Sequence, residues 1–423
     1  MPSFLPSTVV SPSSSALRHW TRKIRDFCHN KHGLFYVLSP SSSLPDSDLA
    51  DLVATLTSVP NSVGCLSSSL PIRSREPATA LSFAILQESS NFTPFRSTIP
   101  GRKPTSVGRW HSVKTHQEEK NPPLEHRSPQ TSLEEIRGIQ RYVLPSEIRN
   151  LNPKNTRTVL YLSDNSPEGL SQALSSAFPS SAQLGFLASP TPFLTGRPFT
   201  LFQNEKVYSS GAVGVCLSSP VTNLDVEPPH LTPITDALTV TSAEGNLIHT
   251  LDDTNPVKLI ISAMDKHNRS VSGDKQLLKE DQFYLGVLRD DRVHRLYQVM
   301  SGGPSRGIVS LEGESGPARG STVRIYYLPS ISKPVDGAVV NKGYHFLNLN
   351  PDSVGAAAFE LDRSILRTSV GQDSDGSAET TFAGAFLAAT EHGCIVRRPG
   401  PGDIAESAWR FSAPAGQIHL DFS

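Results

Sequence analysis

A pattern of strand, helix and strand occurs twice in this chain, about 120 residues apart. In the first copy, the apolar run Leu34–Ser39 predicts a buried strand, Asp46–Leu56 places its leucines on one helical face, and Ser62–Ser67 predicts a second strand. The second copy shows the same three patterns in the same order, at Thr158–Ser163, Ser166–Phe178 and Gln183–Ala188. Two such copies predict two similarly built halves around a pseudo-two-fold relation, with a natural place for a ligand between them.

The second strands of the two copies also match residue by residue. Val63–Ser68 and Leu184–Ser189 occupy corresponding places, each with a glycine as its second residue and a proline soon after its end. Between the copies, residues 88–141 are polar, contain prolines and lack periodicity, which is typical of a solvated insertion. We expect its bulky runs Phe92–Ser97 and Gly108–His111 to dock on the body of the protein.

From Lys206 onward the sequence predicts mainly strands. Leu238–Thr241 and Leu247–Leu251 flank the tight-turn signal Glu244–Asn246, which indicates a hairpin. The apolar run Val257–Ala263 predicts another strand. Further strands are predicted at Val207–Leu217, Phe283–Leu288, Tyr297–Met300, Ile308–Leu311 and Thr322–Tyr327. The Pro- and Gly-containing stretch Ile331–Val340 is a predicted boundary, and a last, short unit follows it.

The N-terminal residues allow two interpretations that do not exclude each other. Residues 1–25 are rich in Ser and contain four basic residues and no acid, which is the composition of a mitochondrial transit peptide. Leu17, Trp20, Ile24 and Phe27 also recur at helical spacing, so the stretch 16–30 can form a first amphipathic helix.

Composition argues against several classes of protein. The chain has 423 residues with 39 Lys plus Arg and 40 Asp plus Glu, a formal net charge of -1, so no basic excess indicates nucleic acid as a partner. No segment approaches the ~18–20 apolar residues of a membrane helix. Four scattered cysteines fit neither a disulfide framework nor a CxxC metal site. We therefore expect an intracellular, reduced protein, either cytoplasmic or mitochondrial.

Several short motifs resemble the FIST domain, which is named for F-box and intracellular signal transduction proteins. The motifs follow the family's order: Val63-Gly-Cys-Leu-Ser67, Ser210-Gly-Ala-Val-Gly-Val-Cys216, Val240–Ile248, Phe283-Tyr-Leu-Gly286, Gly307–Leu311 with Gly320–Arg324, and Gly384–Gly393. The resemblance runs from about Ala16 to the end of the chain, and Phe95–Ser97 with Gly108–His111 look like elements of stand-alone fungal members.

The resemblance implies a fold and a division of the chain. The fold is expected to be mixed α/β (α+β), with duplicated strand-helix-strand units extended by antiparallel sheet. Residues 1–15 are expected to be disordered or a targeting segment. An N-terminal FIST-like domain is expected at 16–330, with the copies at 16–87 and 156–217 and the insertion at 88–141, and a short C-terminal FIST-like domain at 341–423. With no F-box-like segment before the repeat, the resemblance implies no ubiquitin-ligase adaptor.

Gly64, Cys65 and Ser67 form the first candidate binding segment. If the loop after this strand is the lip of a ligand site, Gly64 allows close approach of the backbone, while Cys65 and the serines 67–69 supply a thiol and hydroxyls. The alternative is a small buried cysteine beside a turn glycine, because free Cys behaves as a small hydrophobe and the second copy has Phe186 at the equivalent position.

Glu391–Cys394 brings three reactive side-chain types together. Strand alternation places His392 and Cys394 on one face and Glu391 on the other, which disfavours a hydrolase relay within the segment. The FIST resemblance instead matches Glu391 and Gly393 to a carboxylate-glycine motif that would bind a ligand amine, although Thr390 stands where glycine is common. An ordinary strand end is the alternative.

Arg109 and Trp110 either cap a pocket or anchor the insertion to the core. The Gly-rich runs 301–307 and 315–320 lack a phosphate-loop pattern and predict hairpin turns. His111 and His116 have no accompanying ligand pattern, so no metal is predicted. No cofactor is predicted either, although one His or Cys would suffice as an axial ligand of haem.

Together these features predict a small-ligand-binding sensory module of signal transduction, with an amino-acid-like metabolite as the ligand and a separate protein partner for its output. The alternative is a protein interaction scaffold that uses the insertion 88–141. A Cys-dependent hydrolase is the weakest alternative, and no enzyme activity is predicted. Neither nucleic acid nor a membrane is expected as a partner.

Overall fold

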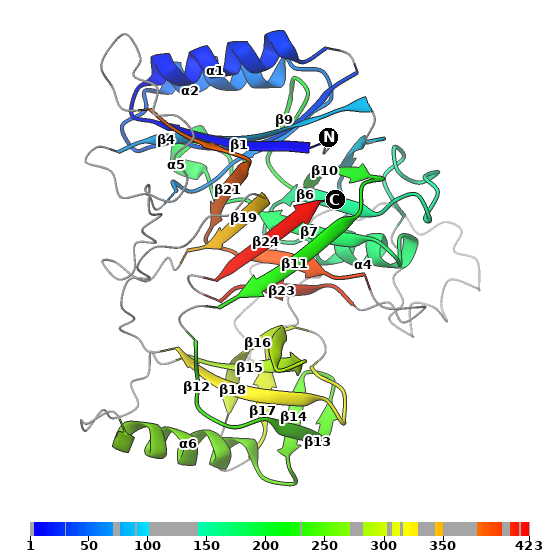
Figure 1. Cartoon of the computed structure of the whole chain (residues 1–423), viewed down its shortest axis with the longest axis vertical. Helices are drawn as coiled ribbons and strands as arrows, with labels where there is room; N and C mark the ends of the chain where they lie inside the picture. The colour runs from blue at the N-terminus through cyan, green and yellow to red at the C-terminus, as the bar shows by residue number, and fades with distance from the viewer. Residues whose placement is uncertain are drawn as a thin grey trace, which may run out of the picture.

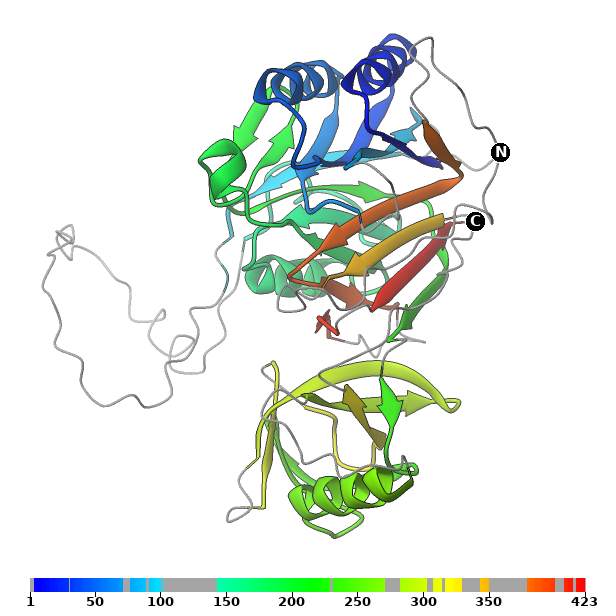
Figure 2. The same ribbon diagram turned by 90° about the vertical axis from the view of Figure 1, so that its left-hand side faces the viewer.

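The computed structural model describes residues 4–29, 31–70, 77–88, 91–99, 101, 143–228, 231–270, 282–302, 307–313, 316–328, 343–349, 379–399, 407–413 and 416–422. These residues build three β-sheets and, at one end of the molecule, a small β-barrel (Figures 1 and 2). Helices and strands are mixed, as expected for an α+β fold.

The first sheet contains the first predicted copy. β2 (Gly33–Ser39) and β3 (Ser62–Leu66) pair in parallel, and α2 (Asp46–Thr57) connects them. β4 (Thr79–Leu86) pairs antiparallel with the other edge of β2. Every residue of β2 and β3 is buried, as in parallel strands covered on both faces. In spatial order the strands of this sheet are β20 (Thr380–Ala383), β1 (Phe4–Ser11), β4, β2, β3, β8 (Leu201–Gln203) and β9 (Lys206–Tyr208).

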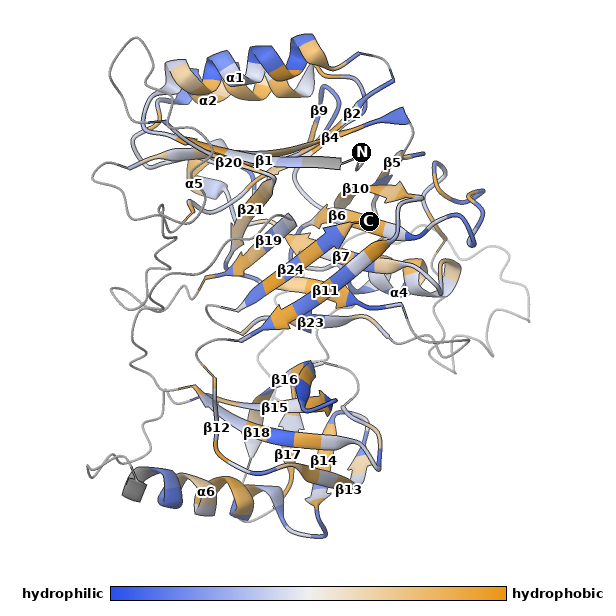
Figure 3. Cartoon of the chain, viewed as in Figure 1, coloured by the Kyte–Doolittle hydropathy of each residue, from blue (hydrophilic) through white to orange (hydrophobic). Residues whose placement is uncertain are grey.

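Two helices cover the outer face of the first sheet. α1 (Ser14–Phe27) lies beside α2, and Arg18 links them through Asp48 at 2.7 Å and Asp51 at 2.9 Å. The buried face of α1 includes Leu17 and Ile24, and its hydrophilic residues lie on the outside (Figure 3). α1 is the amphipathic helix predicted over 16–30. No helix among the described residues is both long enough and apolar enough to cross a membrane.

Residues 4–15 form regular structure in place of the expected disorder. Phe4–Ser11 form β1, which pairs with β4 over its whole length and with β20 on its other side, and α1 begins at Ser14. Val9 and Val10 are buried in the core. This short strand is difficult to recognise in the sequence, because the Ser and Pro residues in and around it are typical of turns and interrupt its apolar pattern.

The second sheet contains the second predicted copy. β6 (Thr158–Ser163), α4 (Glu168–Ala177) and β7 (Ala182–Leu187) again form a parallel pair with a connecting helix, and β10 (Ala212–Leu217) pairs antiparallel with β6. Order, direction and pairing are those of β2, α2, β3 and β4. In spatial order the strands of this sheet are β23 (Trp409–Phe411), β22 (Cys394–Arg397), β7, β6, β10 and β5 (Thr93–Ser97).

β5 comes from the start of the predicted insertion 88–141. It pairs with β10, and its Phe95 is fully buried, so this part of the insertion does dock on the body. Residues 102–142 lie outside the described residues. Phe35 and Cys65 of the first sheet share one hydrophobic cluster with Leu160 and Phe186 of the second, which forms the main core.

The third sheet is built mainly by the end of the chain. In spatial order its strands are β11 (Val221–Glu227), β24 (Gln417–Phe422), β19 (Gly343–Asn348) and β21 (Ala385–Thr390). Other strands of the range 341–423 complete the first two sheets: β20 pairs with β1, and β22 pairs with β7. The described strands of this range are therefore distributed over three sheets.

Hydroxyl groups connect β21, an edge strand of the third sheet, to the first sheet. Thr8 donates to the carbonyl of Ala385 at 2.9 Å, Ser82 to the carbonyl of Leu387 at 2.5 Å, and Ser67 to the carbonyl of Ala389. The amide of Leu387 donates in turn to the Thr8 hydroxyl at 2.9 Å. Side chains of the first sheet thus supply hydrogen-bond partners to backbone groups on the buried, unpaired edge of the third sheet.

The barrel lies between β11 and β19 in the sequence. Its strands pair in a closed ring, β18 (Thr322–Leu328), β13 (Leu238–Glu244), β14 (Leu247–Leu251), β17 (Val309–Leu311), β16 (Arg292–Gly302) and β15 (Gln282–Arg289), with the short β12 (Thr232–Pro233) beside β18. The predicted hairpin is β13 and β14. The predicted strand Val257–Ala263 is wrong: it lies in α6 (Pro256–Ser270), whose Val257 and Met264 are buried. Short apolar runs do not distinguish a strand from a buried helix.

Candidate ligand site

The ends of three strands from distant parts of the sequence meet in a polar cluster. Ser68 follows β3 and Ser189 follows β7, at the matching positions of the two copies. Their hydroxyl oxygens lie 2.6 Å apart, and the Ser68 amide donates to Ser189 Oγ at 3.1 Å. The turn after β21 completes the cluster, because Ser68 Oγ donates to Oε1 of Glu391 at 3.1 Å. Equivalent residues of the two copies, Ser68 and Ser189, therefore contact each other, but only Ser68 donates to the carboxylate of Glu391.

The hydroxyl protons of this cluster can be assigned from its acceptors. Ser68 gives its single hydroxyl proton to the acceptor-only carboxylate of Glu391, so the short contact between the serines uses the proton of Ser189. Ser67 is buried and donates to the carbonyl of Ala389. Ser68 thus donates directly to Glu391, and Ser189 supports Ser68 from behind.

Arg410 of β23 holds the turn after β21. Its Nε and Nη2 donate to the carbonyl of His392 at 3.0 and 2.8 Å, and Nη2 also donates to Oδ1 of Asn165 at 2.6 Å. Burial lowers the pKa of His392 below its usual value; nearby Arg410 lowers it further, and Glu391 partly opposes both. Carboxylate, imidazole and guanidinium are thus grouped around one three-residue turn.

Two charged groups of this cluster keep unused hydrogen-bonding capacity. Within the described part of the chain, Oε2 of Glu391 and Nη1 of Arg410 have no hydrogen-bond partner. Ser68, Glu391 and His392 are half-buried, while Ser69 and Pro190 beside them are exposed, so solvent reaches the cluster. We name Ser67, Ser68, Ser189, Glu391, His392 and Arg410 the serine–glutamate site.

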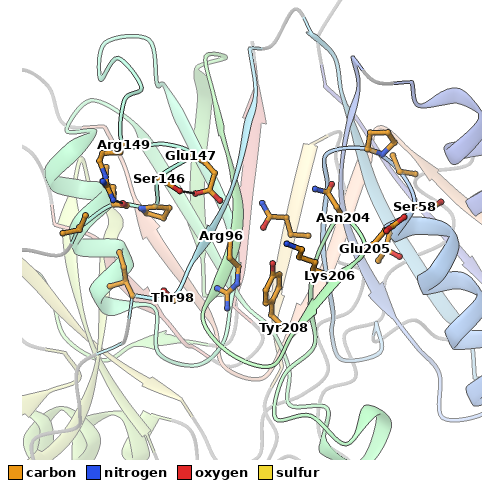
Figure 4. Close-up of a pocket in the computed structure, with 18 residues that line it drawn as sticks. Ser58, Arg96, Thr98, Ser146, Glu147, Arg149, Asn204, Glu205, Lys206 and Tyr208 are labelled. Carbon is orange, nitrogen blue, oxygen red and sulfur yellow. Dashed lines mark hydrogen bonds between the residues drawn. The ribbon is translucent and has the colours of Figure 1, made fainter. Parts of the chain in front are cut away.

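A separate cavity of about 930 Å³ lies between the two copies (Figure 4). Its walls are the end of α2, the end of β5, the turn 143–149 and the hairpin of β8 and β9. Of the predicted ligand-binding residues that the structure describes, none lines this cavity. A second cavity of about 540 Å³ lies beside Asn91–Thr93 and Lys154–Arg157.

Comparison with known protein families agrees with this architecture. The family model of the FIST N domain matches residues 31–254, which is 224 of the 423 residues. The chain belongs to the FIST family. The FIST match begins before β2 and ends just after β14, so it contains Ser67, Ser68 and Ser189 but neither Glu391 nor Arg410. No curated protein matches the chain. FIST domains are associated with signal transduction and small-ligand sensing, which assigns this chain to that broad class.

Gly64, predicted to let a ligand approach the backbone, contacts the protein instead. A Cβ at this position would lie 2.3 Å from Cζ of Tyr36, so the tyrosine ring occupies the space that a side chain would need. The second copy repeats the arrangement, because a Cβ on Gly185 would lie 2.2 Å from Cζ of Tyr161. The two glycines of the FIST copies match because each accommodates a tyrosine of the neighbouring parallel strand.

Cys65 and Cys394 are packed in the core. Both are at most 2% exposed, and burial raises the pKa of both thiols well above the usual value. A catalytic cysteine needs the opposite, an accessible thiol with a lowered pKa. Their surroundings therefore fit the interpretation of small buried residues and oppose hydrolase chemistry.

Gly393 shapes the turn after β21. Its φ of +82° favours glycine, and a Cβ would lie 2.2 Å from the carbonyl oxygen of Phe411. Arg109 and Trp110 lie outside the described residues. No group of three or more His, Cys, Asp or Glu side chains in the described residues is arranged to hold a metal ion.

The serine–glutamate site combines residues that the sequence predicts to bind a ligand with residues that it does not. Ser67 and Glu391 were predicted binding residues, and the structure brings them into one cluster although 323 positions separate Ser68 from Glu391. Ser189 is not among the predicted binding residues, although its position in the second copy matches that of Ser68 in the first and could have pointed to it. Nothing in the sequence around Arg410 indicates a binding residue, because it reaches the site only through the pairing of β22 with β7 and β23.

Proposed function

We propose that this FIST protein is a sensory module that binds an amino-acid-like metabolite at the serine–glutamate site. The free carboxylate oxygen of Glu391 suits an ammonium group, and the free Nη1 of Arg410 suits a carboxylate. The hydroxyls of Ser68 and Ser189 add further hydrogen bonds. An amine and a carboxylate on one small molecule would use both charged groups of the site.

The observation that carries this proposal is the contact of Ser68 with both Ser189 and Glu391. The site joins the two FIST copies to the turn between β21 and β22. A ligand bound there would contact segments of all three sheets. That arrangement suits a sensor, since binding would stabilise the relative positions of these segments.

A thermal-shift screen of the full-length protein against the common amino acids tests the proposal, followed by titration calorimetry with the best ligand. We expect Glu391→Gln to weaken binding by about tenfold or more, because a charged hydrogen bond contributes about 1.5–3 kcal/mol. Glu227→Gln, an exposed change on β11, is the matched control and should bind like the wild type. Folded protein that binds no amino acid, or binding that survives Glu391→Gln unchanged, contradicts the proposal.

Two alternatives predict different results in the same experiments. A Soret band in the purified protein would favour haem as the ligand. The scaffold alternative places a protein partner on the insertion 88–141. Ile99 within this insertion and Val143 just after it both line the large cavity. Deletion of 114–127 would then remove partners in a pull-down and leave the response to amino acids intact.

A further inference from the structure

The large cavity has three walls that the fold fixes in place. On the side of β8 and β9, the Asn204 amide donates to the carbonyl of Ser62 at 2.9 Å, and Asn204 Oδ1 accepts from the Ser62 amide at 3.1 Å. On the opposite side, the fully buried Ile148 anchors the turn 143–149 in the core. β5 forms the floor through its pairing with β10. A preformed cavity of about 930 Å³ is of the size of small-molecule sites.

Three cations from three different elements line this cavity. Arg96 belongs to β5, Arg149 to the turn and Lys206 to β9. Within the part of the chain that the structure describes, none of the three forms an ion pair. Figure 4 shows Arg96 and Lys206 near the middle of the cavity and Arg149 on its far wall.

Arg96 is the most informative of these cations. Its guanidinium donates only to carbonyls, those of Ser97, Ala212 at 2.9 Å and Ser210 at 2.5 Å, and it lies 4.3 Å from the ring centre of Tyr208. Its Nε is buried and has no partner among the described residues. Burial lowers the pKa of this guanidinium, and Tyr208 and Asp164 only partly oppose that effect. A half-buried cation without a bonded carboxylate is costly, and a bound anion would offset that cost.

The remaining lining residues are mostly hydrogen-bonding groups. Glu147 and Glu205 add two carboxylates to the three cations, and Ser58, Ser146 and Asn204 add hydroxyl and amide groups. Ser146 donates to Glu147 at 3.0 Å, so this carboxylate is already oriented. Carboxylates beside cations can accept hydrogen bonds from hydroxyl groups of a ligand. An anion without hydroxyl groups has no donor for them.

We propose that this cavity is a second binding site, for a small anion that also carries several hydroxyl groups, as sugar phosphates and sugar acids do. Arg96, Arg149 and Lys206 bind the phosphate or carboxylate. Glu147 and Glu205 accept hydrogen bonds from the hydroxyls. This site is distinct from the serine–glutamate site, because the two share no residue.

Titration calorimetry of the full-length protein at constant ionic strength tests this proposal with four probes: glucose 6-phosphate, gluconate, inorganic phosphate and glucose. We expect one or both of the hydroxylated anions to bind at least about tenfold more tightly than phosphate or glucose, since both the charge and the hydroxyls contribute. The glucose 6-phosphate and gluconate arms distinguish a phosphate ligand from a carboxylate ligand.

Variants locate the binding. Lys206→Gln and Arg149→Gln change exposed side chains and should each weaken binding by about tenfold, while the exposed Lys258→Gln on α6 serves as the control. Glu391→Gln should leave this binding unchanged. The proposal is overturned if folded protein binds none of the probes, if phosphate binds as tightly as both hydroxylated anions, if Lys206→Gln and Arg149→Gln bind like the control, or if Glu391→Gln abolishes binding.

Discussion

At the scale of single residues, the matched glycines show how packing and sequence repetition coincide. Gly64 looks like a ligand-contacting glycine in the sequence, yet both Gly64 and its match Gly185 lie under a tyrosine of their own sheet. The tyrosines could have indicated this, because Tyr36 and Tyr161 stand at matching positions in β2 and β6 and pair with these glycines in register. Sequence alone could not show that register.

Gly64→Ala should destabilise the protein by about 1–3 kcal/mol, because the new methyl group overlaps the ring of Tyr36. Urea denaturation measures the change in the free energy of unfolding. Gly185→Ala should have an effect of similar size. Adding Tyr36→Leu should recover part of the loss from Gly64→Ala, which a double-mutant cycle detects as coupling. Unchanged stability of Gly64→Ala would refute this packing account.

His392 gives the serine–glutamate site a predicted pH response. The folded protein holds the pKa of His392 below its usual 6.5 through burial and Arg410. The neutral imidazole therefore contributes stability that is fully present above about pH 6.5 and is lost as the pH falls through the lowered pKa.

NMR titration of the His392 ring should give a midpoint below 6.5, and Glu391→Gln should lower that midpoint further, since it removes the group that opposes the shift. A midpoint above 6.5, or one that rises in Glu391→Gln, would be inconsistent with the site as described.

At the scale of secondary structure elements, side-chain hydroxyls replace strand pairing along β21. Thr8 and Ser82 supply both partners of the Leu387 backbone, and all of these groups are buried. A buried carbonyl or amide that loses its partner costs about 1–3 kcal/mol. The third sheet is therefore attached to the first through a few specific hydroxyls as well as through apolar contact.

Thr8→Val keeps the shape of the side chain and removes its hydroxyl, so it should lower the free energy of unfolding by about 1–3 kcal/mol. Thr8→Ser keeps the hydroxyl and should cost less. Chemical denaturation compares the two variants, and hydrogen exchange of the Leu387 amide should accelerate in Thr8→Val. Equal stability of the two variants would show that the hydroxyl does not matter.

The elements that the sequence predicts well are those with local signals. β2, α2, β3, β6, α4 and β7 each have a complete apolar pattern, and the hairpin of β13 and β14 has a turn signal at Gly245, whose φ is +57°. Long-range pairing has no such local signal. β20 joins β1 and β22 joins β7 across hundreds of residues, so the placement of 379–422, and with it Glu391 and Arg410, could not be predicted.

At the scale of the whole molecule, the serine–glutamate site connects parts that fold from distant sequence. Its contacts span 121 residues between Ser68 and Ser189 and 323 between Ser68 and Glu391. The barrel, in contrast, lies at the other end of the molecule from α1 and α2 (Figure 2). The strand β23, which carries Arg410, is followed by Ser412, whose hydroxyl donates to Glu312 beside the barrel strand β17 at 2.9 Å.

Hydrogen exchange of the full-length protein should therefore report binding at three separate segments together. An amino-acid ligand should increase protection around 67–69, 188–190 and 390–393, because it bridges groups on all three. Protection of only one of these segments would contradict a bridging ligand. The barrel strands β13 and β14 serve as an internal control, with no direct contact to the site.

The most direct test of the central claim is a crystal structure of the full-length protein with its best-stabilising amino acid bound. We predict density at the serine–glutamate site, with the ligand ammonium group within hydrogen-bonding distance of Glu391 and the ligand carboxylate beside Arg410. Density elsewhere in the molecule, with Glu391 and Arg410 making no contact to the ligand, would contradict the assignment of this site.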